Sequence, residues 1–194
     1  MWIKICGMRT AEAVAAALDA GVAAIGFVFA ESPRRVTPRE AALLAAPARG
    51  KICCVAVTRH PDQQQVDEIL AEFRPDVLQT DARDLARLRL PRWLERLPVL
   101  RDSNTPETLP TRLLFEGASS GVGRVCDWNA AREVARRTEL VLAGGLDPDN
   151  VTAAIAAVRP FGVDVSSGVE SSPGVKDPTA VARFVAAARD AGTT

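Results

Sequence analysis

The sequence predicts an α/β protein built as a single (β/α)8 TIM barrel over residues 1–194. Eight short apolar runs alternate with six or seven helical patterns, and repeated βα units of this kind form parallel sheets. The last two apolar runs each end in a glycine-rich turn, as the phosphate-binding loops after strands 7 and 8 of such barrels do. The length of 194 residues lies close to the roughly 200-residue lower end for this fold, so short loops are expected.

Strand and helix boundaries follow from apolar alternation, capping residues and turn residues. Strands are expected at 2–6, 24–29, 51–57, 77–79, 97–101, 112–115, 140–143 and 162–165. Helices are expected at 11–20, from 38, at 61–73, 83–90 and 128–137, and from 148 and 178.

Capping signals support most of these helix boundaries. Thr10 is expected to cap the first helix, and Thr37 precedes a proline at the start of the second. Asp147 and Asp177 each precede a proline in the same way, so both are expected to begin helices. The helix after the fifth strand is expected to be reduced or absent, because Pro106 and Pro110 bracket too few residues.

Composition narrows the class of partner. Acidic and basic residues number 24 each, so neither nucleic acid nor an anionic membrane is an expected partner. Apolar residues make up 47% of the chain, which predicts a globular protein, and no apolar run reaches the ~18 residues of a membrane span. The chain opens directly into a strand, so no secretory or transit segment is predicted and a cytoplasmic location is expected.

The cysteines predict neither a metal site nor a disulfide framework. Cys53 and Cys54 are adjacent, so their side chains point to opposite faces of a strand. No CxxC pair occurs and His60 is the only histidine, so no metal is expected, and reduced thiols are the default.

Three stretches carry candidate chemistry. In the first strand, Cys6 shares a face with Lys4 while Ile3 and Ile5 share the other, which predicts Cys6 at the inner, carboxyl end of the strand. Gly144 and Gly145 in one turn, and Ser166, Ser167 and Gly168 in the next, are suited to a phosphate through backbone N–H groups and hydroxyls. The plainer interpretations are a buried core cysteine and two tight strand-to-helix turns.

Six motifs in order resemble one family, the N-(5'-phosphoribosyl)anthranilate isomerases of tryptophan biosynthesis. The resemblance covers essentially the whole chain. The motifs are Lys4-Ile5-Cys6-Gly7-Met8, Gly26-Phe27-Val28-Phe29, Ser32-Pro33-Arg34, Cys126-Asp127-Trp128, Leu142-Ala143-Gly144-Gly145-Leu146 with Asn150-Val151, and Val163 to Glu170.

The resemblance implies an Amadori rearrangement on a barrel of the ribulose-phosphate-binding type, with a small phosphorylated substrate and no cofactor. It implies Cys6 as the general base and Asp127 as the general acid. A thiol and a carboxyl both need an altered pKa for these roles. From its position before Trp128 alone, Asp127 is equally interpreted as a helix N-cap.

The same resemblance implies the binding residues. Arg34 would meet the substrate carboxylate, because a guanidinium pairs with it through two hydrogen bonds. Gly144, Gly145, Ser167 and Gly168 would hold the phosphate. Asp164 is expected to point inward, because it shares its parity with Ser166, and is placed in the substrate site. The family implies a monomer or a homodimer.

The match to the family pattern has gaps. Asp81 stands where the family usually carries a histidine after strand 4, Glu116 replaces the usual aspartate after strand 6, and the glycine-rich loop that follows reads Ser120-Gly121-Val122-Gly123. Two alternatives therefore remain open. One is a sugar isomerase of histidine biosynthesis on a related phosphate-binding barrel. The other is a barrel that binds a phosphate ligand without catalysis.

Overall fold

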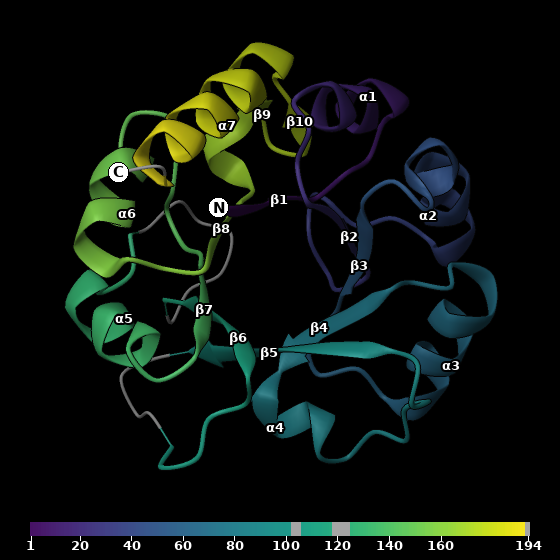
Figure 1. Ribbon diagram of the computed structural model, residues 1–194. Coiled ribbons are helices and arrows are strands. Elements are labelled where there is room, and N and C mark those ends of the chain that lie inside the picture. Colours follow the sequence, from purple (N-terminus) through teal and green to yellow (C-terminus); the bar gives the residue numbers. More distant parts are fainter. Residues whose placement is uncertain (102–105, 118–124, 193–194) are drawn as a thin grey trace.

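Eight parallel strands close into a barrel in the order of the chain, which confirms the TIM-barrel prediction (Figure 1). The computed structural model describes residues 1–101, 106–117 and 125–192. The barrel strands are β1 (Trp2–Cys6), β2 (Ala24–Val28), β3 (Cys53–Val57), β4 (Val77–Asp81), β5 (Glu95–Arg101), β6 (Arg112–Glu116), β7 (Glu139–Leu142) and β8 (Gly162–Val165).

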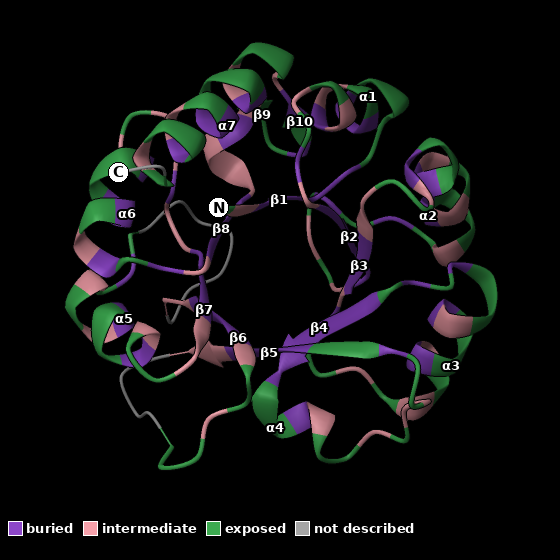
Figure 2. Cartoon of the chain, in the orientation of Figure 1, coloured by how far each residue is buried: buried purple, intermediate pink, exposed green. Residues whose placement is uncertain are grey.

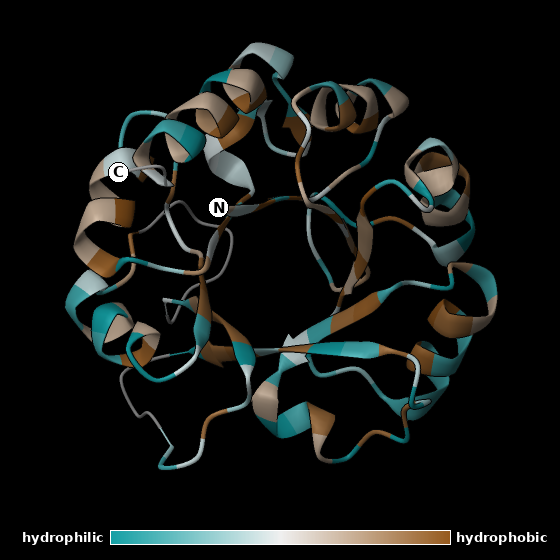
Figure 3. Ribbon diagram, viewed as in Figure 1, coloured by the Kyte–Doolittle hydropathy of each residue, from teal (hydrophilic) through white to brown (hydrophobic). Residues whose placement is uncertain are grey.

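The helices form an outer ring around this barrel. They are α1 (Ala11–Asp19), α2 (Pro38–Ala45), α3 (Gln63–Glu72), α4 (Ala82–Leu85), α5 (Trp128–Ala135), α6 (Val151–Val158) and α7 (Pro178–Gly192), with a 3-10 turn η1 (Ala46–Ala48) after α2. The predicted caps at Thr10 and Asp177 accept hydrogen bonds from the first turns of α1 and α7. Thr37 and Glu40 form a reciprocal capping box on α2. In Figure 3 the helices carry both hydrophobic and hydrophilic segments, as amphipathic helices that cover a barrel do.

The structure departs from the predicted helices at two places, α4 and the start of α6. α4 has only four residues. The connection from β5 to β6 agrees with the prediction of a reduced or absent helix: its described residues, 106–111, contain no helix, and residues 102–105 lie outside the described chain. α6 begins at Val151, later than predicted, and residues 148–150 form a turn, although the Asp147 carboxylate accepts the N–H groups of Asp149 and Asn150 as a helix cap does.

A small hairpin after β8 was not predicted. Beyond the 3-10 turn η2 (Ser167–Val169), β9 (Glu170–Ser172) pairs antiparallel with β10 (Val175–Lys176). Gly174 in the turn has a φ of 84°, which glycine adopts readily. The hairpin brings Glu170 and Lys176 to the carboxyl ends of the barrel strands.

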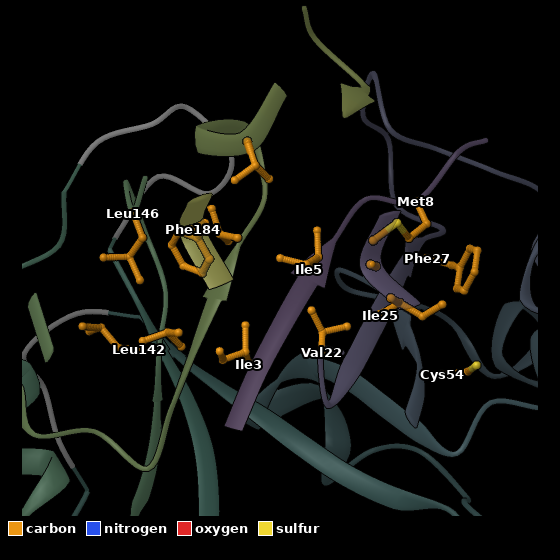
Figure 4. Close-up of a cluster of buried hydrophobic side chains, with 14 of the residues drawn as sticks. Ile3, Ile5, Met8, Val22, Ile25, Phe27, Cys54, Leu142, Leu146 and Phe184 are labelled. Atoms are coloured by element: carbon orange, nitrogen blue, oxygen red, sulfur yellow. The ribbon is translucent and has the colours of Figure 1, made fainter. Parts of the chain in front are cut away.

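Two hydrophobic layers hold the barrel together. The larger layer lies between strands and helices and includes Ile3, Ile5 and Phe27, so the predicted outward face of β1 is confirmed (Figure 4). The smaller layer fills the barrel interior with side chains such as Val55, Leu97 and Leu114. Figure 2 shows most of the barrel strands buried, apart from an exposed part of β5, and the outer faces of the helices exposed.

Barrel closure sets the neighbours of β1. In the β1–β8 pair Lys4 lies opposite Asp164, and in the β1–β2 pair Cys6 lies opposite Gly26. Because paired positions of parallel strands bring their side chains to the same face, these four residues belong to one inward-facing group. Among the described helices, none is long and apolar enough to cross a membrane.

Candidate active site

A cavity of about 740 Å³ opens at the carboxyl ends of the barrel strands. Its walls come from strand ends and from the loops that follow them. Among the predicted site residues, the lining includes Cys6, Arg34, Asp164, Gly144, Gly145 and Ser167. The structure therefore brings together residues that lie up to 161 positions apart in the sequence, from Cys6 to Ser167.

Cys6 ends β1 and faces the cavity with 7% of its surface exposed. Burial raises the pKa of the Cys6 thiol above its usual value, because the thiolate loses its contact with water. The nearby ammonium of Lys4 acts in the opposite direction and lowers the pKa of Cys6. The state of this thiol is therefore decided by a balance between burial and neighbouring charge.

Lys4 and Asp164 form a buried ion pair beneath the cavity. The Lys4 Nζ atom donates to Asp164 Oδ1 at 2.9 Å, and Lys4 has no exposed surface. Burial alone would lower the pKa of Lys4, but the Asp164 carboxylate keeps it raised. Asp164 faces inward as predicted. Sequence parity already placed Lys4 on the Cys6 face, yet its partner became evident only from the closure of β1 on β8.

Arg34 is held by a partner that the sequence analysis did not assign. Its Nε and Nη2 atoms donate to the two carboxylate oxygens of Glu170 at 2.7 and 2.8 Å. Lys176 Nζ donates to the same carboxylate at 2.7 Å, and the Gly174 N–H donates at 3.2 Å. Burial would raise the pKa of Glu170, but the hydrogen bonds from Arg34 and Lys176 hold it below its usual value.

The side chain of Arg34 also depends on a glycine. A Cβ atom on Gly7 would lie 2.6 Å from Arg34 Cδ, so the stem of Arg34 crosses directly over the Gly7 backbone. Gly7 has a φ of 87°, which disfavours any other residue there. Together, Gly7 and Glu170 hold the Arg34 guanidinium at the cavity wall.

The two glycine-rich turns lie against each other. Gly144 and Gly145 have φ values of 89° and 68°, and the Asn150 side chain donates to the Gly145 carbonyl oxygen. Gly144, Gly145 and Ser167 line the cavity. Gly168 is not one of the lining residues, and a Cβ atom there would lie 2.0 Å from the Leu146 carbonyl oxygen. The role of Gly168 visible in the structure is to let the two turns approach closely.

We expect Gly168→Ala to destabilise the protein by about 1–3 kcal/mol, because the backbone oxygen of Leu146 must move to make room. Thermal unfolding measures this as a lower Tm. Gly50→Ala is the control for a new methyl group, since no atom lies within 4 Å of its Cβ position, although its φ of 71° carries its own strain. A Gly168→Ala variant as stable as the wild type would contradict the close packing of the turns.

Asp127 lies at the N-terminus of α5 and is exposed. Its Oδ1 atom accepts hydrogen bonds from the N–H groups of Asn129 and Ala130 at 2.8 and 3.2 Å, so it caps the helix. Asp127 is not among the described residues that line the cavity. The departures noted at Ser120, Gly121, Val122 and Gly123 lie outside the described residues, and this segment directly precedes the cap.

Asp81 is buried in a network of charged side chains at the ends of β4, β5 and β6. Arg101 donates to Asp81 at 2.6 Å and to Glu116 at 2.9 Å. His60 Nε2 lies 3.6 Å from Asp81 Oδ2, and His60 Nδ1 lies 2.9 Å from Asp84 Oδ2. The side chains of His60, Asp81 and Asp84 are close enough together to hold a metal ion. Two of the carboxylate oxygens already accept hydrogen bonds: Asp81 Oδ1 from Arg101 and Asp84 Oδ2 from the backbone N–H of His60. The negative charge of Asp81 is therefore compensated by Arg101 instead of facing the cavity uncompensated.

Gln79 is a further cavity residue that the sequence analysis did not single out. It is 5% exposed, and its buried Oε1 atom has no hydrogen-bond partner among the described residues. Its inward position could have been inferred from the alternation of β4, in which Val77 and Gln79 share a face. An unpaired buried acceptor at the wall favours a ligand that donates a hydrogen bond.

Active sites of (β/α)8 barrels are built at the carboxyl ends of the strands, and the polar cavity opens at this end. The fold and the site therefore define an enzyme of the (β/α)8-barrel class.

Comparison with known proteins identifies the family within that class. Residues 3–187 match the model of the N-(5'-phosphoribosyl)anthranilate isomerase family. An N-(5'-phosphoribosyl)anthranilate isomerase from Brucella canis is 38% identical, with 97% of this chain and 94% of the relative covered. The chain belongs to the N-(5'-phosphoribosyl)anthranilate isomerase family, and it is an isomerase.

Solved structures agree with this assignment. TrpF from Jonesia denitrificans superposes with a TM-score of 0.82 at 36% identity, covering 98% of each chain. A phosphoribosyl anthranilate isomerase in complex with reduced 1-(o-carboxyphenylamino)-1-deoxyribulose 5-phosphate superposes with a TM-score of 0.81 at 26% identity, covering 98% of this chain and 99% of the other.

Proposed function

We propose that this isomerase converts N-(5'-phosphoribosyl)anthranilate into 1-(2-carboxyphenylamino)-1-deoxyribulose 5-phosphate, a step of tryptophan biosynthesis. One observation carries the proposal. A single cavity is lined by a thiol, an arginine and a glycine turn, which suit the reacting carbon, the carboxylate and the phosphate of this substrate. Membership of the family and the ligand named for the solved relative support it.

The reaction needs one acid and one base. In the first step the Asp127 carboxyl gives its proton to the ring oxygen as the C1'–oxygen bond breaks, and the nitrogen lone pair forms an iminium. In the second step the Cys6 thiolate takes the proton from C2', and the electrons of that bond form the C1'–C2' double bond while the iminium becomes an amine. The enol then becomes the ketone as C1' gains a proton and the C2' hydroxyl loses one. Atoms and electrons balance without an oxidant.

The binding residues divide between the two anionic ends of the substrate. Glu170 engages the Nε and Nη2 side of Arg34, so the Nη1 side is the one proposed to meet the anthranilate carboxylate. Gly144, Gly145, Ser167 and Gly168 are proposed to hold the phosphate, chiefly through backbone N–H groups. Asp164 Oδ1 accepts a hydrogen bond from Lys4, and Asp164 Oδ2 is proposed to accept a hydrogen bond from a substrate hydroxyl.

Arg34→Gln is expected to raise KM by about tenfold or more with a smaller change in kcat, because a charge-assisted hydrogen bond contributes about 1.5–3 kcal/mol. Steady-state kinetics, with calorimetry of the reduced product analogue, would measure the loss. Arg35→Gln is the matched control, because the neighbouring Arg35 is exposed and does not line the cavity. An unchanged KM in Arg34→Gln would contradict the carboxylate assignment.

A barrel that binds a phosphate ligand without turnover is the second candidate. The position of Asp127 favours it, because this residue is exposed and already accepts two hydrogen bonds as a helix cap. The experiment supplies wild-type protein with phosphoribosylanthranilate and, separately, with the ribotide substrate of the histidine-pathway isomerase. Turnover of the first substrate supports the proposal, turnover of the second alone supports the histidine-pathway reaction, and binding of the analogue without turnover supports the second candidate.

A further inference from the structure

Lys4 is a fully buried cation to which the proposed reaction assigns no role. It has no exposed surface, and its Nζ atom donates to Asp164 Oδ1 at 2.9 Å. Removing an ammonium group from water is unfavourable by several kcal/mol, on the order of the stability of a whole domain. A buried ion pair can often be replaced by apolar side chains without loss of stability, so stability alone does not explain Lys4.

Gly26 creates the space in which Lys4 meets the thiol. A Cβ atom at Gly26 would lie 3.1 Å from Cys6 Sγ and 3.2 Å from Lys4 Nζ, so both groups converge on the same missing side chain. Lys4 and Cys6 are two positions apart on β1 and share its inward face, while Gly26 pairs with Cys6 from β2. Ammonium and sulfur are therefore neighbours above a single glycine backbone.

The charged groups around Cys6 are one negative charge short of balance. Lys4 on β1, Lys176 on β10 and Arg34 in the β2–α2 loop are the cations, and Asp164 on β8 and Glu170 on β9 are the carboxylates. Three cations against two carboxylates leave a net charge of +1 around a neutral thiol. Ionisation of Cys6 brings the group to neutrality, which favours the thiolate in a low-dielectric site.

We propose that Lys4 is a positioning residue that stabilises the thiolate form of Cys6 Sγ over the Gly26 backbone, with Asp164 fixing the ammonium in place. The catalytic importance of Lys4 rests on the proposed function, because a thiolate is the form that accepts the C2' proton. The thiolate itself is measured without substrate, so the two proposals are tested separately.

Ultraviolet absorbance near 240 nm, followed against pH, reports thiolate formation in this protein with little interference. The chain contains no tyrosine. Burial raises the pKa of all four thiols, that of Cys53 to about 12 and those of Cys54 and Cys126 to about 11, so the wild-type titration alone does not identify the Cys6 transition. Cys6→Ala identifies the transition that belongs to Cys6.

Lys4→Met is expected to move the Cys6 midpoint upward by one pH unit or more, because it removes the cation and keeps the length of the side chain. Lys51→Met is the matched control, since Lys51 is exposed, and it should keep the wild-type midpoint. A folded Lys4→Met protein with an unchanged Cys6 midpoint would overturn the proposal.

Lys4→Met leaves the buried Asp164 carboxylate without its partner and can fail to fold for that reason. Two further variants test the proposal in that case. Asp164→Asn should lower the Cys6 midpoint, and adding Lys4→Met to it should raise the midpoint again. Gly26→Ala keeps every charge but inserts a methyl group between sulfur and ammonium, so it should also raise the midpoint. If the double variant titrates like Asp164→Asn, Lys4 has no role in the ionisation of Cys6.

Kinetics add a readout that a purely structural role would not change. The thiolate exists above its pKa, so kcat/KM should rise with pH through the Cys6 midpoint, and a raised midpoint moves this rise to higher pH. At a fixed neutral pH, kcat/KM should fall about tenfold for each unit of increase. A Lys4-dependent titration without wild-type turnover would refute the proposed function and leave the Lys4 inference standing.

Discussion

Replacing Cys6 with alanine is expected to lower kcat for phosphoribosylanthranilate by about 10³-fold or more while the fold is retained. A positioned general base contributes roughly 10²–10⁴-fold to a rate, and no second thiol lines the described cavity. The substitution removes only one sulfur atom from a residue that already faces a cavity, so a small change in Tm is expected. Cys6→Ser should lose nearly as much activity, because a hydroxyl ionises far less readily than a thiol.

Cys53→Ala is the matched control for this prediction. Cys53 lies on β3, packs against the inner hydrophobic layer and does not line the cavity. It should therefore retain the wild-type kcat with a comparable change in stability. Near-normal turnover in a folded Cys6→Ala protein would show that Cys6 is not the base.

Asp127→Asn is expected to lower kcat by about 10²–10⁴-fold with little loss of stability. Asparagine caps helices as well as aspartate, so the hydrogen bonds to the Asn129 and Ala130 N–H groups can be kept. The amide has no acidic proton to give to the ring oxygen. Asp127→Ala should lose the same activity and, in addition, about 1 kcal/mol of stability with the cap.

Asp177→Asn separates the capping role from the proposed acid role. Asp177 caps α7 with the same pattern, accepting the N–H groups of Thr179 and Ala180 through Oδ1, and it does not line the cavity. Kinetics and Tm would be compared for the two variants. If Asp127→Asn resembles Asp177→Asn in keeping full activity, Asp127 is a helix cap and another group supplies the proton.

Local signals were sufficient for most of the barrel. The β-strand pattern of residues 2–6, the N-cap at Thr37 and the aspartate before Pro178 each depend on near neighbours in the chain, and the structure has them as predicted. The start of α6 and the β9–β10 hairpin differ from the expectation. The hairpin strands have only three and two residues, which is too short for an alternating pattern to predict them.

The site was predictable only in part, because several of its contacts cross the whole chain. Parity placed Cys6 and Asp164 on inward faces, and glycine turns pointed to the residues around Gly144. The pairing of Lys4 with Asp164 needs the closure of β1 on β8, and that of Arg34 with Glu170 joins residues 136 positions apart. Such contacts leave no periodic pattern in the sequence, so they emerged from the three-dimensional structure.

The most direct test of the account is a turnover assay with the wild-type enzyme and Cys6→Ala side by side. Phosphoribosylanthranilate is generated in the cuvette, and the loss of its anthranilate fluorescence follows its conversion. The account predicts rapid loss with the wild type and almost none with Cys6→Ala. Intact fluorescence with a folded wild-type protein, or equal loss with both proteins, would contradict it.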